Sequence, residues 1–63
     1  MKQIATTTKT FTKEAKRIIA GNIADPFSTI SKVGKNRVIR NADGKCVATW
    51  HHRVGQNGLI VIH

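Results

Sequence analysis

Acidic residues are scarce in this chain, which contains three Asp and Glu among 63 residues. Enzymes that work through paired carboxylates need two acids close together, so this composition nearly excludes that chemistry. The sequence also has no P-loop, no GxGxxG motif and no Ser/His/Asp arrangement. We therefore expect no cofactor, because neither phosphate-cradling loop is present.

The chain also has little cysteine and no long apolar run. Cys46 is the only cysteine, which excludes an internal disulfide and a CxxC-type zinc site. His51 and His52 are adjacent, and successive side chains of a strand point to opposite faces, so we expect no metal site there. The longest apolar run, residues 59–62, is too short for a membrane span or a signal-peptide core. We expect a cytoplasmic protein without a membrane partner.

Aromatic residues are few: Phe11, Phe27 and Trp50, with no Tyr. Proteins that read single-stranded RNA usually expose several aromatic side chains for stacking. The sequence therefore favours contact with the phosphate backbone over stacking-based recognition.

Basic residues are abundant, since 11 Lys and Arg give a formal net charge of +8. Such an excess points to a polyanionic partner: nucleic acid first, RNA or DNA, and the acidic surface of another protein second. The length allows one domain, because 63 residues are too few to form a second hydrophobic core.

A helix is predicted over residues 13–23. Thr12 is a candidate N-cap and Glu14 lies in the first turn, where the helix dipole favours a carboxylate. One apolar stripe runs along the helix, and three cations occupy the other side. The stripe consists of Ala15, Ile18, Ile19 and Ile23, and the cations are Lys13, Lys16 and Arg17.

The rest of the chain has a β pattern. Strands are predicted at residues 27–33, 37–40, 45–52 and 59–62, and residues 41–44 read as a turn with Gly44 in the left-handed region. The apolar run at 59–62 indicates a strand placed centrally or covered on both faces. The threonine-rich residues 1–10 are either an edge strand or a flexible arm.

The predicted fold is α+β, with residues 11–63 as a single domain. One N-terminal helix packs on a three- or four-stranded antiparallel sheet, arranged as a β-meander. An exposed sheet edge would allow a homodimer, because so small a core gains from one.

The register of the first hairpin decides which side chains share a face. If Asn41 opposes Lys45, Val38 joins Cys46, Ala48 and Trp50 on the helix side. The open face then carries the alternate residues: Arg37, Ile39, Lys45, Val47, Thr49 and His51.

Two sets of candidate site residues follow from these assignments. The nucleic-acid contacts are predicted to come from basic and polar residues on the helix and the sheet: Lys13, Lys16, Arg17, Arg37, Arg40, Lys45, Thr49 and Arg53. His51 or His52 could instead serve as the acid–base group of a metal-independent ribonuclease, with cations stabilising the phosphorane. A third alternative is a small phage-like inhibitor or adaptor that docks on an acidic protein.

Two family resemblances arise from these residues. The order of a basic helix, a strand, Asn41-Ala42-Asp43-Gly44 and a last strand at 58–62 resembles small bacterial ribonuclease toxins with a barnase-, colicin- or RelE-like sheet. Thr49-Trp50-His51-His52 followed by residues 58–61 resembles the first hairpin of a WHH-type HNH nuclease. That family implies a histidine base and a following helix with metal ligands. The sequence ends at His63 before such a helix, so we expect no metal-dependent activity.

Overall fold

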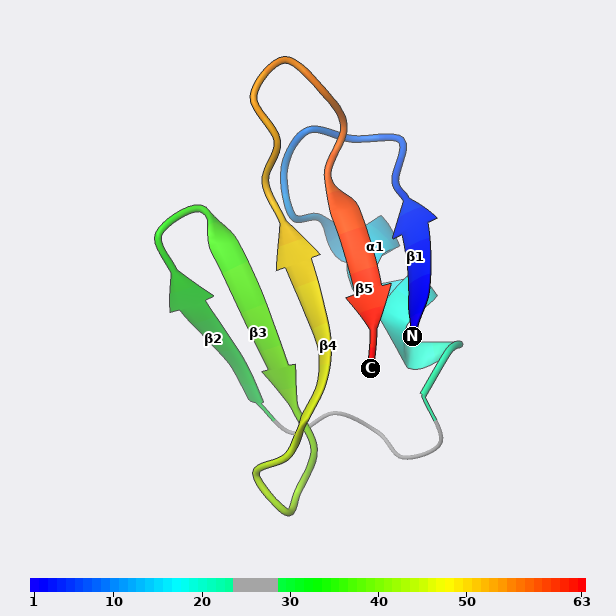
Figure 1. Cartoon of the computed structure of the whole chain (residues 1–63), viewed down its shortest axis with the longest axis vertical. Helices are drawn as coiled ribbons and strands as arrows, with labels where there is room; N and C mark the ends of the chain where they lie inside the picture. The colour runs from blue at the N-terminus through cyan, green and yellow to red at the C-terminus, as the bar shows by residue number, and fades with distance from the viewer. Residues whose placement is uncertain (24–28) are drawn as a thin grey trace.

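Five antiparallel strands form one sheet with the order β1-β5-β4-β3-β2, and a short helix lies against one of its faces (Figure 1). The computed structural model describes residues 1–23 and 29–63. The elements are β1 (Lys2–Ala5), α1 (Lys13–Ala20), β2 (Thr29–Val33), β3 (Asn36–Arg40), β4 (Cys46–His51) and β5 (Leu59–Ile62).

The predicted fold class was wrong. The protein is a mainly antiparallel β structure with five strands and one described helix of eight residues, whereas an α+β domain with three or four strands was expected. The additional strand is β1, at the edge of the sheet beside β5. Its sequence, KQIA, contains one large apolar side chain, Ile4, so it carries almost no alternating pattern.

The interior position of β5 explains why β1 forms. The prediction that residues 59–62 lie centrally is confirmed, because β5 pairs with β1 on one side and β4 on the other. Its side chains Ile60, Val61 and Ile62 are all buried. Without β1, the backbone N–H and C=O groups along one side of this strand would lack ladder partners.

The helix buries the predicted stripe but is shorter than predicted. Ala15 and Ile19 are fully buried in the core, and Ile18 and Ile23 pack against it half-buried. The helix ends at Ala20, because the chain turns at Gly21. Thr12 occupies the N-cap position, but its side chain makes no capping hydrogen bond.

A β-bulge corrects the predicted register of the first hairpin. Asn41 and Lys45 pair as predicted, and Gly44 has the left-handed φ of +81°. The register then shifts between Ile39 and Arg40, so that Ile39 pairs with Ala48. Because a shift of one residue exchanges the faces of a strand, the remaining face assignments of β3 were wrong.

The two faces of the sheet therefore differ from the prediction. Ile39 is fully buried and Arg37 pairs with Trp50, so both lie on the side covered by the helix, which we call the helix side. Val38 pairs with Thr49 on the opposite, open face. The predicted group of Arg37 with Thr49 and His51 does not exist.

Two further predictions concern the start of β2 and the membrane. Residues 27 and 28 of the predicted strand 27–33 lie outside the described residues, and the rest of that strand is β2. Within the described part of the chain, no helix is long and apolar enough to cross a membrane.

Candidate functional site

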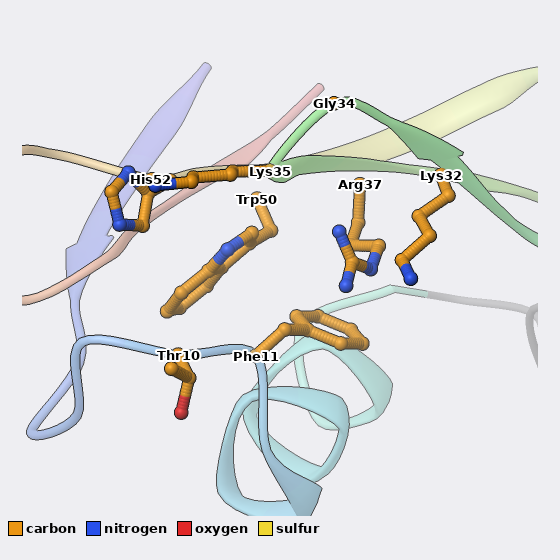
Figure 2. Close-up of a pocket in the computed structure, with 8 residues that line it drawn as sticks. All are labelled: Thr10, Phe11, Lys32, Gly34, Lys35, Arg37, Trp50 and His52. Carbon is orange, nitrogen blue, oxygen red and sulfur yellow. The ribbon is translucent and has the colours of Figure 1, made fainter.

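An open pocket of about 370 Å³ lies on the helix side, between the segment that leads into α1 and the β2–β3 hairpin (Figure 2). We call it the basic pocket. Its lining residues come from three stretches of the chain: Thr10, Phe11, Lys32, Gly34, Lys35, Arg37, Trp50 and His52. In Figure 1, α1 lies behind β5 and β1, so β2 and β3 extend beyond the helix. This overhang leaves room for the pocket.

Cations from the β2–β3 hairpin form one wall of the basic pocket. Lys32 pairs with Arg37 across the hairpin, so their side chains share the helix side. Lys35 occupies the two-residue turn, whose first position, Gly34, has φ +61°. A glycine with positive φ at that position is typical of a type II′ hairpin. In Figure 2 the side chains of Lys32 and Arg37 extend from the hairpin toward Phe11.

Two aromatic side chains also line the pocket: Phe11 faces the hairpin, and Trp50 projects from β4 beside Arg37, its cross-strand partner. The rings of Phe11 and Trp50 meet edge to face, with centroids 5.5 Å apart. The guanidinium carbon of Arg37 lies 5.7 Å from the Phe11 centroid, and Nζ of Lys16 lies 6.0 Å from it. Cations at this distance are attracted to the ring quadrupole, by about 0.5–1 kcal/mol at exposed sites. Phe11 therefore lies against two cations, of which Arg37 lines the pocket.

The threonine-rich segment determines where Phe11 lies. Oγ1 of Thr6 is buried and lies 2.9 Å from the carbonyl oxygen of Gly58 and 3.0 Å from that of Thr8. Oγ1 of Thr8 donates to the carbonyl of Thr10 at 2.9 Å. Threonine hydroxyls commonly bond to nearby backbone in this way, which stabilises turns. Residues 6–10 are therefore an ordered connection that presents Phe11 to the hairpin.

The missing side chain of Gly58 makes space for Trp50. A Cβ atom at Gly58 would lie 1.8 Å from Cη2 of the indole. Trp50 is 1% exposed, so its ring fills the space between β4 and the start of β5. The predicted position of Trp50 on the helix side is confirmed. Because the basic pocket lies on the same side, Trp50 also contributes to its lining.

The histidines are divided between the two faces, as strand alternation predicted. The backbone N–H of His52 donates to Oδ1 of Asn36 at 2.9 Å, and its ring lines the basic pocket. On the open face, Oγ1 of Thr49 lies 2.9 Å from Nε2 of His51 and 3.4 Å from Nε2 of His63. The two candidate catalytic residues are therefore on opposite sides of the sheet.

The other predicted contact residues do not gather at one place. Lys13 and Arg17 are exposed on the side of α1 away from the buried Ala15. Nη1 of Arg40 donates to the carbonyl of Gly44, in the β3–β4 turn that also carries Lys45. This turn lies at the end of the sheet opposite the β2–β3 turn (Figure 1).

Arg53 follows β4, and its Nε donates to the carbonyl of Asn57 at 2.9 Å. Of the predicted set, Lys16 and Arg37 are thus the two that lie against the ring of Phe11.

The acidic residues that the structure describes do not neutralise the pocket cations. The carboxylate of Glu14 accepts hydrogen bonds from the backbone N–H and the hydroxyl of Thr7. Asp43 lies in the β3–β4 turn at the far end of the sheet. The basic pocket is therefore a local concentration of positive charge.

Sequence reasoning missed the contributions of Lys32, Lys35 and Phe11 to this site. The short turn at Gly34 could have indicated the two lysines, because it predicts a hairpin. A hairpin at this turn brings Lys32 and Lys35 close to Arg37. Nothing in the local pattern of Phe11 indicates that it meets residues from the other half of the chain.

The histidines, cysteine and acids do not form a metal site in the described residues, where no cluster of three or more such groups occurs. Comparison of the chain with protein-family models, curated proteins and solved structures finds no match. The resemblance to ribonuclease toxins and HNH nucleases therefore stays a prediction.

Proposed function

We propose that this protein binds nucleic acid through contacts between the basic pocket and the phosphate backbone. The observation that carries the proposal is that Lys32, Lys35 and Arg37 line one pocket. Arg37 and Lys16 also lie against the half-buried ring of Phe11. These cations come from the helix and from a hairpin distant in sequence. Because like charges repel, bringing them together costs free energy that an anionic ligand offsets.

Binding is better supported than cleavage. A metal-independent ribonuclease needs a base for the 2′-hydroxyl and an acid for the leaving oxygen. His52 lines the basic pocket, whereas His51 and His63 contact Thr49 on the open face. The pocket therefore offers one imidazole, and the arrangement favours a binding role.

The proposal is tested by measuring affinity against salt, using nuclease-treated protein and a labelled oligonucleotide. Each phosphate neutralised contributes about 0.7 to the magnitude of the log–log salt slope for single strands and about 0.9 for duplex DNA. Four cations, the three Lys and Arg that line the pocket together with Lys16 beside Phe11, predict a slope of about −3 for a single strand if each engages one phosphate. Binding that does not change with salt would contradict the proposal.

Arg37 and Arg40 provide a matched pair of variants, because they belong to the same strand but lie on different faces. Arg37→Gln is expected to reduce the slope magnitude by about 0.7 on single strands. Arg40→Gln removes the same charge outside the pocket and is expected to leave the slope as it was. Equal effects of both variants would show that net charge, and not the pocket, determines binding. Inclusion of RNA in EDTA in the same assay also measures cleavage.

A further inference from the structure

The basic pocket contains two features that contact with phosphates alone does not need: aromatic side chains in its lining and a volume that can hold a small ligand. Phe11 and Trp50 are two of the three aromatic residues in the protein, and both line this pocket. Because Trp50 is 1% exposed, the half-buried Phe11 supplies the accessible ring surface. The volume of about 370 Å³ lies at the lower end of the range for pockets that hold small ligands. A surface that only attracts a polyanion would require neither feature.

We infer that the basic pocket accommodates one unpaired nucleobase, so that the ligand is single-stranded nucleic acid. This inference rests on the proposed function. Bases stack on aromatic rings and on the guanidinium planes of arginine. The ring of Phe11 and the guanidinium of Arg37, 5.7 Å apart, place both types of surface side by side, so a base stacks on the free side of one of them.

The arrangement of charge matches the chemistry of a nucleotide. In Figure 2, Lys32 and Arg37 extend from the hairpin on one side, and the rings of Phe11 and Trp50 lie below and beside them. A base against Phe11 leaves its sugar-phosphate directed to the hairpin, where Lys32 at one end of the pocket and Lys35 at the other each offer a point charge to a phosphate. The pocket thus binds the two chemically different parts of one ligand.

Duplex nucleic acid does not fit this mode of binding. Its bases are paired and stacked, and extruding one costs a few kcal/mol, as base-flipping enzymes demonstrate. A single strand presents its bases without that cost. Recognition by stacking is tolerant of sequence, because every base has a π face.

The test uses Trp50, which is the only Trp in a chain without Tyr, so its fluorescence reports on the pocket directly. The protein is titrated with oligouridylate, oligothymidylate, an abasic phosphodiester chain of the same length, and a duplex. Stacking of one base is expected to make the base-bearing strands bind about 5- to 150-fold more tightly than the abasic chain. These strands should also change Trp50 emission more than the abasic chain does.

The outcomes separate the inference from the proposed function. Equal affinity for base-bearing and abasic strands, or tighter binding of the duplex, would overturn the inference but leave phosphate contact standing. Absence of binding to every probe would overturn both. The uridylate and thymidylate arms distinguish RNA from DNA as the source of the base.

A variant pair tests whether the ring of Phe11 is responsible. Phe11→Leu removes the ring but keeps an apolar side chain, and it is expected to lower the affinity for base-bearing strands to that for the abasic chain. Ile4→Val is the control, because Ile4 also packs against the core but belongs to β1, at the far edge of the sheet. If Ile4→Val abolishes base discrimination as fully as Phe11→Leu does, loss of packing and not loss of the ring is the cause, and the inference fails.

Discussion

Replacement of Gly58 by alanine tests the packing that forms the pocket wall. The added Cβ would lie 1.8 Å from Cη2, 2.1 Å from Cζ2 and 2.4 Å from Cζ3 of Trp50. Favourable carbon–carbon contacts lie at about 3.5–4.0 Å, so either the indole or the backbone at residue 58 must move. Both are held in place.

The indole is confined by burial and by the edge-to-face contact with Phe11 at 5.5 Å between centroids. The backbone of Gly58 donates to the carbonyl of Thr8 at 2.9 Å and accepts from the N–H of Thr6 at 3.0 Å. Overpacking a core costs about 1–3 kcal/mol and occasionally more. Because neither side can yield easily, we expect a loss of about 3 kcal/mol in the free energy of unfolding for Gly58→Ala.

That loss is large for so short a chain. At 0.05–0.15 kcal/mol per residue, a domain of 63 residues has a total stability of about 3–9 kcal/mol. Urea unfolding followed by circular dichroism measures the change. Gly21→Ala is the matched control, because Gly21 has φ −77° and its nearest contact to an added Cβ is 3.5 Å away. We expect Gly21→Ala to change the stability by about 0.5 kcal/mol or less.

A double mutant shows whether the clash with Trp50 is the cause. Trp50→Phe removes the outer ring atoms that the new Cβ would meet, at its own cost in lost packing. The combined variant is expected to lose less stability than the sum of the two single changes, by about 0.5–3 kcal/mol. A Gly58→Ala protein as stable as the parent, or additive effects of the two changes, would refute this account of the packing.

Two polar contacts give further predictions, both measured by thermal unfolding. Thr6→Val removes a buried hydroxyl, but the carbonyl of Gly58 keeps the backbone N–H of residue 6 as a donor, so we expect a loss of only about 1 kcal/mol, or about 4–8 °C in Tm. A loss several times larger would show that the hydroxyl, and not the backbone bond, holds this connection. Asn41→Ala is expected to cost about 1 kcal/mol, because Oδ1 of Asn41 accepts from the backbone N–H groups of Asp43 and Lys45, both at 3.0 Å. Asn41→Asp retains an acceptor, so it should unfold close to the parent temperature, and a drop equal to that of alanine would contradict the role of the side chain.

The parts of the fold that the sequence predicted are those controlled by local pattern. The stripe of Ala15 and Ile19 indicates which side of the helix is buried, and both residues are fully buried. Gly44 was correctly placed in the left-handed region of a tight turn. The apolar run at 59–62 correctly predicted a central strand.

The parts that could not be predicted depend on partners distant in sequence. The sequence left residues 1–10 open between an edge strand and a flexible arm, and the pairing of β1 with β5 decides for the edge strand. The pocket depends on Phe11 meeting Arg37, which lies 26 positions further along the sequence. The β-bulge has no marker in the sequence, since neither glycine nor proline occurs between Lys45 and Trp50.

The bulge connects the core to the charge of the site. Ile39 and Arg37 are two positions apart on β3, so their side chains point to the same face. Burial of Ile39 therefore places Arg37 on the helix side, beside Phe11. Without the bulge, Val38 would be buried and Arg37 would join Thr49 on the open face, as the regular register predicted.

The bulged register gains about 0.8 kcal/mol from burying isoleucine instead of valine, the value of one methylene group. The cation–π contact of Arg37 adds about 0.5–1 kcal/mol. Both terms favour the same register, and together they offset a disrupted ladder hydrogen bond, which is worth about 0.5–1.5 kcal/mol. Burial of Ile39 in the core thus decides which face of the protein carries Arg37, the arginine of the basic pocket.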